Sequence, residues 1–111
     1  MSIITDTLIK TCDACRDKPA FTYAAEDGYA DITYDSYLKA VTSLQSRLRQ
    51  EKCSPGDRVV LLADYSPKWC AAYMAIHASG CTAVPLDAQY TDSEVKNIIE
   101  FTEPSAVISD E

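Results

Sequence analysis

Apolar side chains recur at steps of three and four residues in four stretches of the chain, which is the spacing of one face of an α-helix. The clearest stretch runs from Tyr37 to Leu48, with charged residues on its other face and Thr33 placed to cap the first turn. Thr91 and Glu94 form a capping box ahead of the last stretch. The predicted helices cover residues 3–16, 34–51, 67–79 and 92–101.

Short runs of β-branched, aromatic and aliphatic residues separate these helices and predict strands. The first two runs flank a glycine-containing turn at residues 26–28, which predicts a β-hairpin. The third run is continuously apolar, as is typical of a strand buried on both faces of a sheet. The predicted strands cover residues 20–23, 29–33, 58–63, 81–85 and 106–109.

The order of these elements predicts an α/β fold. Residues 1–57 contain a helix, a hairpin and a second helix, whereas residues 58–111 alternate strand, helix, strand, helix and strand. Such a βαβαβ unit needs two crossover connections, which make its strands parallel, and right-handed crossovers are the default. We therefore predict an N-terminal helix and β-hairpin followed by a parallel-sheet unit.

The predicted helix at residues 67–79 has almost no polar face. Ser66 and Pro67 mark its start, Gly80 its end, and several alanines keep it slim. A helix that is apolar all round needs cover on every side, and the other predicted elements are too few to supply it. We therefore expect a piece of a larger protein, with uncovered apolar surface that favours self-association.

The acidic composition of the chain excludes several classes of partner. Ten Lys and Arg residues face seventeen Asp and Glu residues, for a formal net charge of −7. Nucleic acids and anionic membranes attract clustered positive charge, so we expect neither as a partner. We also expect no membrane span and no signal peptide, because the apolar stretches are short and no basic segment precedes one at the N-terminus. Five cysteines, an odd number, fit reduced thiols in the cytoplasm.

Cys12 and Cys15 have the C-x-x-C spacing of a redox dithiol. They lie within the first predicted helix rather than between a strand and a helix, so we interpret them as core or surface thiols and keep redox chemistry as an alternative. Neither a second cysteine pair nor a histidine cluster is available to complete a zinc site. His77 lies on an apolar helix without a carboxylate at helical spacing, so we interpret it as a structural residue rather than a catalytic base.

Trp69, Tyr73 and Ile76 form a stripe at helical spacing. Such a stripe has two interpretations: it packs into the core, or it forms a platform for a flat ligand. We interpret it as core, because the helix that carries it is apolar on nearly every side.

Acidic residues follow each strand of the predicted parallel sheet. Asp64, Asp87 and Asp110 lie at the carboxyl ends of strands, where open α/β sheets bind ligands, so a metal site is one interpretation. The other, which we favour, is that they cap or solvate loops, as do the acidic pairs at residues 26–27 and 110–111. The three glycines are far apart, whereas a phosphate-binding loop needs closely spaced glycines.

Several segments resemble the motifs of a known superfamily. They are I-T-Y-D-S-Y-L at residues 32–38, S-P-G-D-R-V at 54–59, S-P-K-W at 66–69 and A-I-H-A-S-G-C-T-A-V-P-L-D at 75–87. In this order and at these spacings they resemble the adenylate-forming enzymes, which include acyl-CoA synthetases, peptide-synthetase adenylation domains and luciferases. The resemblance covers residues 18–111. Tyr65, Lys68 and His77 stand where the family usually has Asn, Glu and Leu, and none of these positions is catalytic.

The resemblance implies that the chain is an N-terminal piece of the large N-terminal domain of an ATP-dependent acid–CoA ligase, most like the fatty acyl-CoA synthetases. Such enzymes use ATP and Mg²⁺ to form an acyl-adenylate, from which CoA displaces AMP. Their phosphate-binding loop, ribose-binding Asp and catalytic Lys lie later in the chain. We therefore expect no catalytic, cofactor-binding or metal-binding residue and no bound cofactor in residues 1–111, and no activity from this piece alone.

The fatty acid substrate would bind through the remainder of such a protein. The identity of the acid, and the choice between CoA and a carrier protein as acceptor, stay open. Two hypotheses from other classes also stay open. One is a standalone small α/β binding or interaction module, and the other is a redox protein that uses Cys12 and Cys15.

Overall fold

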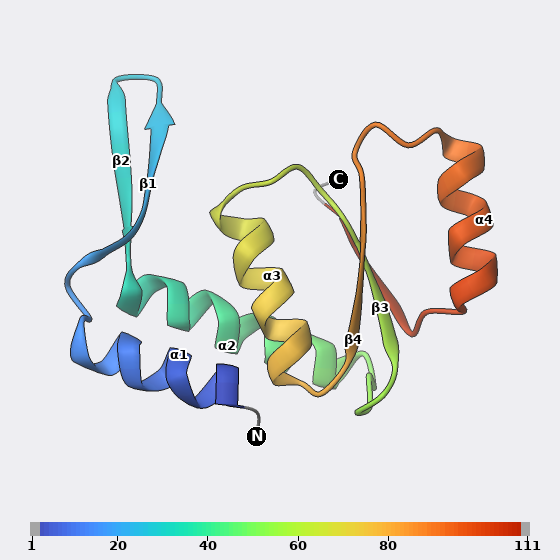
Figure 1. Cartoon of the computed structure of the whole chain (residues 1–111), viewed down its shortest axis with the longest axis horizontal. Coiled ribbons are helices and arrows are strands. Elements are labelled where there is room, and N and C mark those ends of the chain that lie inside the picture. The colour runs from blue at the N-terminus through green and yellow to red at the C-terminus, as the bar shows by residue number, and fades with distance from the viewer. Residues whose placement is uncertain (1–2, 110–111) are drawn as a thin grey trace.

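The computed structural model describes residues 3–109, which form four helices and five strands (Figure 1). In chain order these are α1 (Ile3–Ala14), β1 (Pro19–Ala25), β2 (Gly28–Thr33), α2 (Tyr34–Gln50), β3 (Arg58–Leu62), α3 (Pro67–Ala78), β4 (Thr82–Leu86), α4 (Asp92–Thr102) and β5 (Ala106–Ser109). Each of the predicted helices and strands is present, with boundaries shifted by at most a few residues.

The strands form two separate sheets. β1 and β2 pair antiparallel as a hairpin that projects from the helices, and β4, β3 and β5 form a parallel sheet in that order. Val60 at the centre of β3 is level with Val84 on one side and Val107 on the other. The predicted α/β fold, with a hairpin preceding a βαβαβ unit, is confirmed.

The residues predicted to cap the N-termini of three helices do so in the structure. The hydroxyl of Thr33 accepts a hydrogen bond from the backbone N–H of Ser36, and Ser66 accepts one from Trp69. Thr91 caps α4 in the predicted capping box with Glu94. Each bond satisfies a backbone donor that the first turn of a helix leaves without a partner.

The main core lies between the parallel sheet and α1, α2 and α3. Val59 and Leu61 point from β3 into this core and are fully buried, as is Ile76 of α3. Tyr37 of α2 connects three elements here. Its ring contacts that of Phe21 in the hairpin edge-on, with the ring centroids 5.1 Å apart, and its hydroxyl donates to the backbone carbonyl of Cys70 in α3. α2 and α3 cover one face of the sheet, and α1 packs against these two helices (Figure 1).

Among residues 3–109, α4 alone covers the opposite face, and it does so loosely. It lies across the sheet from α3, and it has no buried residue (Figure 1). Val107 of β5, on this face, is 47% exposed, and Phe101, on the side of α4 away from Ile99, is 89% exposed. The expectation of uncovered apolar surface is therefore met on this side of the sheet.

Candidate functional site

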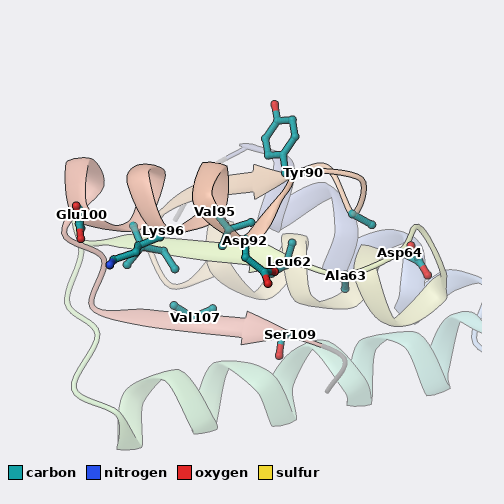
Figure 2. Close-up of a pocket in the computed structure, with 12 residues that line it drawn as sticks. Leu62, Ala63, Asp64, Tyr90, Asp92, Val95, Lys96, Glu100, Val107 and Ser109 are labelled. Carbon is teal, nitrogen blue, oxygen red and sulfur yellow. The ribbon is translucent and has the colours of Figure 1, made fainter.

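A groove of about 760 Å³ lies between α4 and the sheet (Figure 2). Side chains alternate along a strand, so Leu62 and Val107 face this groove while their neighbours Leu61 and Ile108 face the main core. α4 supplies the apolar wall with Val95 and Ile99. The complete lining is Leu62, Ala63, Asp64, Ala88, Tyr90, Asp92, Val95, Lys96, Ile99, Glu100, Val107 and Ser109.

The charged side chains of the groove are spread along it rather than gathered at one point. Glu100 and Lys96 lie toward one end, Asp92 lies near the middle, and Asp64 lies beyond the end of the strand (Figure 2). The ring of Tyr90 points away from the sheet. An apolar floor with a scattered polar rim is suited to receiving another apolar segment rather than to concentrating charge on a reacting atom.

A second groove, of about 500 Å³, runs beside β5 and α2. β5 lies at the end of the strand order, so within the described residues its outer edge pairs with no strand. The apolar residues Leu44 and Leu48 of α2 and Val107 of β5 line this groove. Neither groove was predicted from the sequence, although one signal was available: Val107 alternates away from the core in its strand.

Two of the three aspartates that follow strands, Asp64 and Asp87, lie within the described residues. Asp87 accepts a hydrogen bond from the backbone N–H of Gln89 at 2.8 Å, so it caps its own loop as we favoured. Asp64 lines the large groove, and Asp110 lies outside the described residues. Among residues 3–109, no three His, Cys, Asp or Glu side chains gather closely enough to hold a metal ion.

The predicted stripe of Trp69, Tyr73 and Ile76 is only partly core. Ile76 is fully buried, but the two aromatic rings are half-buried and belong to a row that continues at both ends. Tyr65, which precedes α3, and Trp69, Tyr73 and His77 of α3 lie ring against ring, with centroids 4.9, 5.1 and 5.0 Å apart. Trp69 and Tyr73 pack against the core from its edge, so the interpretation of the stripe as core holds fully for Ile76 and in part for the two aromatic rings. His77 is exposed at the end of this row, and its ring contacts Tyr73 edge-on.

Cys12 and Cys15 are free thiols near the end of α1. Cys12 is 1% exposed, and burial is the largest of the effects that raise the pKa of its thiol, followed by the negative charges of Asp35 and Cys15. A catalytic dithiol of the C-x-x-C type needs the opposite, an accessible nucleophilic thiol with a lowered pKa. This arrangement favours the structural interpretation of both thiols.

None of the helices within residues 3–109 is both long enough and apolar enough to cross a bilayer.

Comparison with known proteins identifies the family. A family model described as AMP-binding enzyme matches residues 8–111. A methyl-dioxo-octahydroindenyl propanoyl:CoA ligase of Rhodococcus jostii is 29% identical over 77% of this chain, and an L-proline–L-prolyl-carrier protein ligase of Streptomyces coelicolor is 30% identical over 84% of it. The chain spans about 16% of the length of each of these two relatives.

The fold of this chain also matches part of longer solved structures. The N-terminal domain of FACL13 from Mycobacterium tuberculosis superposes on 98% of this chain with a TM-score of 0.87 and 23% sequence identity, and this chain covers 27% of that structure. The resemblance drawn from the sequence motifs is confirmed. Because the family model matches nearly the whole chain, the protein belongs to the AMP-binding enzymes, a family of adenylate-forming ligases.

Proposed function

We propose that this chain is a scaffold segment of an ATP-dependent acid–thiol ligase, in which it supplies three parallel strands and their covering helices to the large N-terminal domain. The observation that carries the proposal is the family match over residues 8–111, set against relatives that are about five times as long as this chain. The two open grooves support it, because both offer apolar surface on which further segments of a larger domain would pack.

The reaction of the whole protein would proceed in two steps. A carboxylate attacks the α-phosphorus of ATP to give an acyl-adenylate and pyrophosphate, and a thiol then displaces AMP to give a thioester. ATP and Mg²⁺ would be held by residues outside this segment. The three glycines here serve separate turns, at Gly28, Gly56 and Gly80, and all three have positive φ angles.

We further propose a fatty acid as the carboxylate and CoA as the thiol, acting in the cytoplasm. The Rhodococcus jostii relative, a CoA ligase, supports the CoA acceptor, whereas the carrier-protein ligase of Streptomyces coelicolor supports the competing one. The sequence V-P-L-D-A-Q-Y at residues 84–90 favours the fatty acyl branch. Five free cysteines support a reducing compartment.

Carboxylate-dependent exchange of radiolabelled pyrophosphate into ATP tests this proposal. The assay compares the 111-residue chain with the complete product of its gene, using saturated fatty acids and the standard amino acids as alternative substrates. We expect no exchange from the chain alone and fatty acid-dependent exchange from the complete product. Exchange by the chain alone would refute the scaffold role, and exchange only with amino acids would refute the fatty acid class.

A standalone binding module is the second candidate function, and the groove of about 760 Å³ is the observation that favours it. The reading frame beyond the codon for Glu111 distinguishes the two. A stop codon directly after Glu111 would favour the module. A frame that continues for several hundred codons and includes a glycine-rich loop would eliminate it.

A further inference from the structure

Two turns that are far apart in sequence are held side by side at the N-terminal end of the parallel sheet. One follows α2 at residues 51–57, and the other joins α3 to β4 at residues 79–82. The backbone N–H of Gly56 donates to the carbonyl of Gly80 at 2.9 Å, and that of Thr82 donates to Asp57 at 2.8 Å. These two bonds extend the pairing of β3 with β4 into both turns, so the turns are fixed relative to each other.

Each of these turns carries a cysteine, and the thiol of one of them lies against the backbone of the other turn. The thiol of Cys81 donates to the backbone carbonyl of Ser54 at 3.4 Å, and Ser54 directly follows Cys53 in the chain. Cys53 is held from the other side, because its backbone N–H donates to the carbonyl of Leu48 and its side chain packs against the core. Burial raises the pKa of Cys81, and the charge of a Cys53 thiolate, the next largest effect, raises it further.

The two thiols differ in how accessible they are. Cys81 is 6% exposed, whereas Cys53 is half-buried and reaches solvent. A dissolved oxidant would therefore meet Cys53 first, and Cys81 would follow as the resolving thiol. The other three cysteines offer no comparable pair: Cys12 and Cys15 belong to a single helix end, and Cys70 lies on α3.

We propose that Cys53 and Cys81 form a reversible disulfide that ties the end of α2 to the start of β4 when the thiol–disulfide balance becomes oxidising. With glutathione disulfide as oxidant, the Cys53 thiolate attacks one glutathione sulfur and releases one glutathione thiolate. The Cys81 thiol then loses its proton to solvent and attacks the sulfur of Cys53, releasing the second glutathione. Two cysteine thiols are oxidised and one glutathione disulfide is reduced to two glutathione thiols.

The disulfide would close a loop that contains β3 and α3, the most deeply buried strand and helix of the chain. Closing a loop of this size restricts the unfolded chain more than the folded one. Oxidation should therefore raise the thermal midpoint by roughly 10 °C. Burial is the largest of the effects that raise the pKa of each thiol. The thiolate is the attacking species, so the disulfide should form faster as the pH rises from 7 to 9 and more thiolate is present.

Peptide mapping tests the pairing. The native chain is incubated with glutathione disulfide, its remaining thiols are blocked with iodoacetamide, and it is digested with trypsin. The expected product joins the peptide of residues 53–58 to the peptide of residues 69–96. The second peptide contains both Cys70 and Cys81, so Cys70→Ser is the matched control and should keep the link. Cys81→Ser and Cys53→Ser should each lose it.

The possible results distinguish the Cys53–Cys81 disulfide from other cysteine products. The pair is supported by a link that survives in Cys70→Ser and disappears in Cys81→Ser. The link should also raise the thermal midpoint, and reduction with dithiothreitol should reverse that rise. A link that depends on Cys70, a pair within residues 12–15 alone, or only glutathione adducts on Cys53 would overturn it. A link that forms only in urea would also overturn it, because the proposal requires the folded turns. The result does not depend on ligase activity, so it stands apart from the proposed function.

Discussion

The two faces of the parallel sheet differ sharply in how completely they are packed. On the face toward α2 and α3, Val59 and Leu61 of β3 are fully buried within a continuous core. On the face toward α4, a groove of about 760 Å³ separates helix from sheet, and Val107 of β5 is 47% exposed. The face toward α2 and α3 is therefore closely packed over β3 and open in the groove beside β5, whereas the face toward α4 has apolar surface still to be covered along the whole helix.

The side chains of the two covering helices explain this difference. α3 presents Ala71, Ala72 and Ala75 to its neighbours, and small residues allow its backbone to approach α2 and the sheet closely. α4 presents the branched residues Val95 and Ile99, which reach toward the sheet without filling the space beneath them. α4 also has a regular apolar stripe, yet none of its residues is buried. Burial therefore depends on how closely a helix fits the sheet, and an apolar stripe alone is not sufficient.

Truncating one isoleucine on each helix should give the largest contrast. Ile76→Ala removes a fully buried side chain and should lower the free energy of unfolding by about 3–4 kcal/mol. Ile99→Ala, on the groove wall, should cost about 1 kcal/mol or less, because it enlarges an existing space. Urea unfolding followed by circular dichroism measures both. Equal losses would contradict the difference between the two faces.

Tyr37 gives the face toward α2 and α3 a dependence on alkaline pH. Burial is the largest cause of its raised pKa, which goes from an ordinary 10 to about 12. Below pH 10 both states keep the proton and the stabilisation is complete. Between pH 10 and 12 the unfolded state loses the proton first, so the free energy of unfolding falls as pH rises. Tyr37→Phe should flatten this fall, whereas Tyr29→Phe, at an exposed position, should not.

Tyr37→Phe should also lower the free energy of unfolding by about 1 kcal/mol at pH 7, because it removes the hydrogen bond that the Tyr37 hydroxyl donates to the carbonyl of Cys70 at 3.2 Å. Urea titrations of Tyr37→Phe and Tyr29→Phe at pH 7, 10 and 11 measure both effects. An unchanged alkaline slope in Tyr37→Phe would show that another group is responsible.

The two helix caps should report on the two faces separately. Ser66→Ala removes the cap of α3 and should lower global stability by about 1 kcal/mol, because α3 unfolds only with the core. Thr91→Ala removes the capping box of α4 and should fray that helix with a loss of roughly 0.5 kcal/mol or less. Urea midpoints and hydrogen exchange of the first turns measure the two effects. A larger global loss from Thr91→Ala would contradict the loose attachment of α4.

Phe101→Ser should have the smallest effect on stability and a clear effect on association. The side chain is 89% exposed, so the free energy of unfolding should change by less than about 0.5 kcal/mol. We propose that the isolated chain self-associates through its uncovered apolar surface, and this substitution should then weaken the association. Sedimentation velocity measures it, with Tyr65→Ser, 86% exposed beside α3, as the control. Equal association in both variants would place the contact elsewhere.

Local signals explain which parts of this fold the sequence predicts. Thr33, Ser66 and Thr91 cap helices through bonds to residues three positions away, so a short sequence window contains all the needed information. Gly80, with φ +77°, ends α3 as predicted, because glycine adopts this backbone at no steric cost. Glu103 ends α4 with φ +47°, which side-chain chemistry alone does not predict.

The grooves and the aromatic row depend instead on long-range arrangement. Trp69 and Ile76 have the same apolar character and lie on one helix, yet Ile76 is fully buried and Trp69 is half-buried. Their difference is set by which side of α3 faces α2 and the sheet, and helical spacing does not specify that. The large groove likewise arises from the seating of α4 over β3 and β5, whose order in the sheet the sequence analysis left unspecified.

Hydrogen exchange of α3 and α4 tests the central claim most directly. In the 111-residue chain, amides of α3 should exchange only through global unfolding, whereas those of α4 should exchange at least about 100-fold faster. Within the complete product of the gene, protection of α4 should rise to that of α3 as further segments fill the groove. Equal protection of both helices in the isolated chain would show that the α4 face is already covered, and would contradict the account of this chain as a scaffold segment.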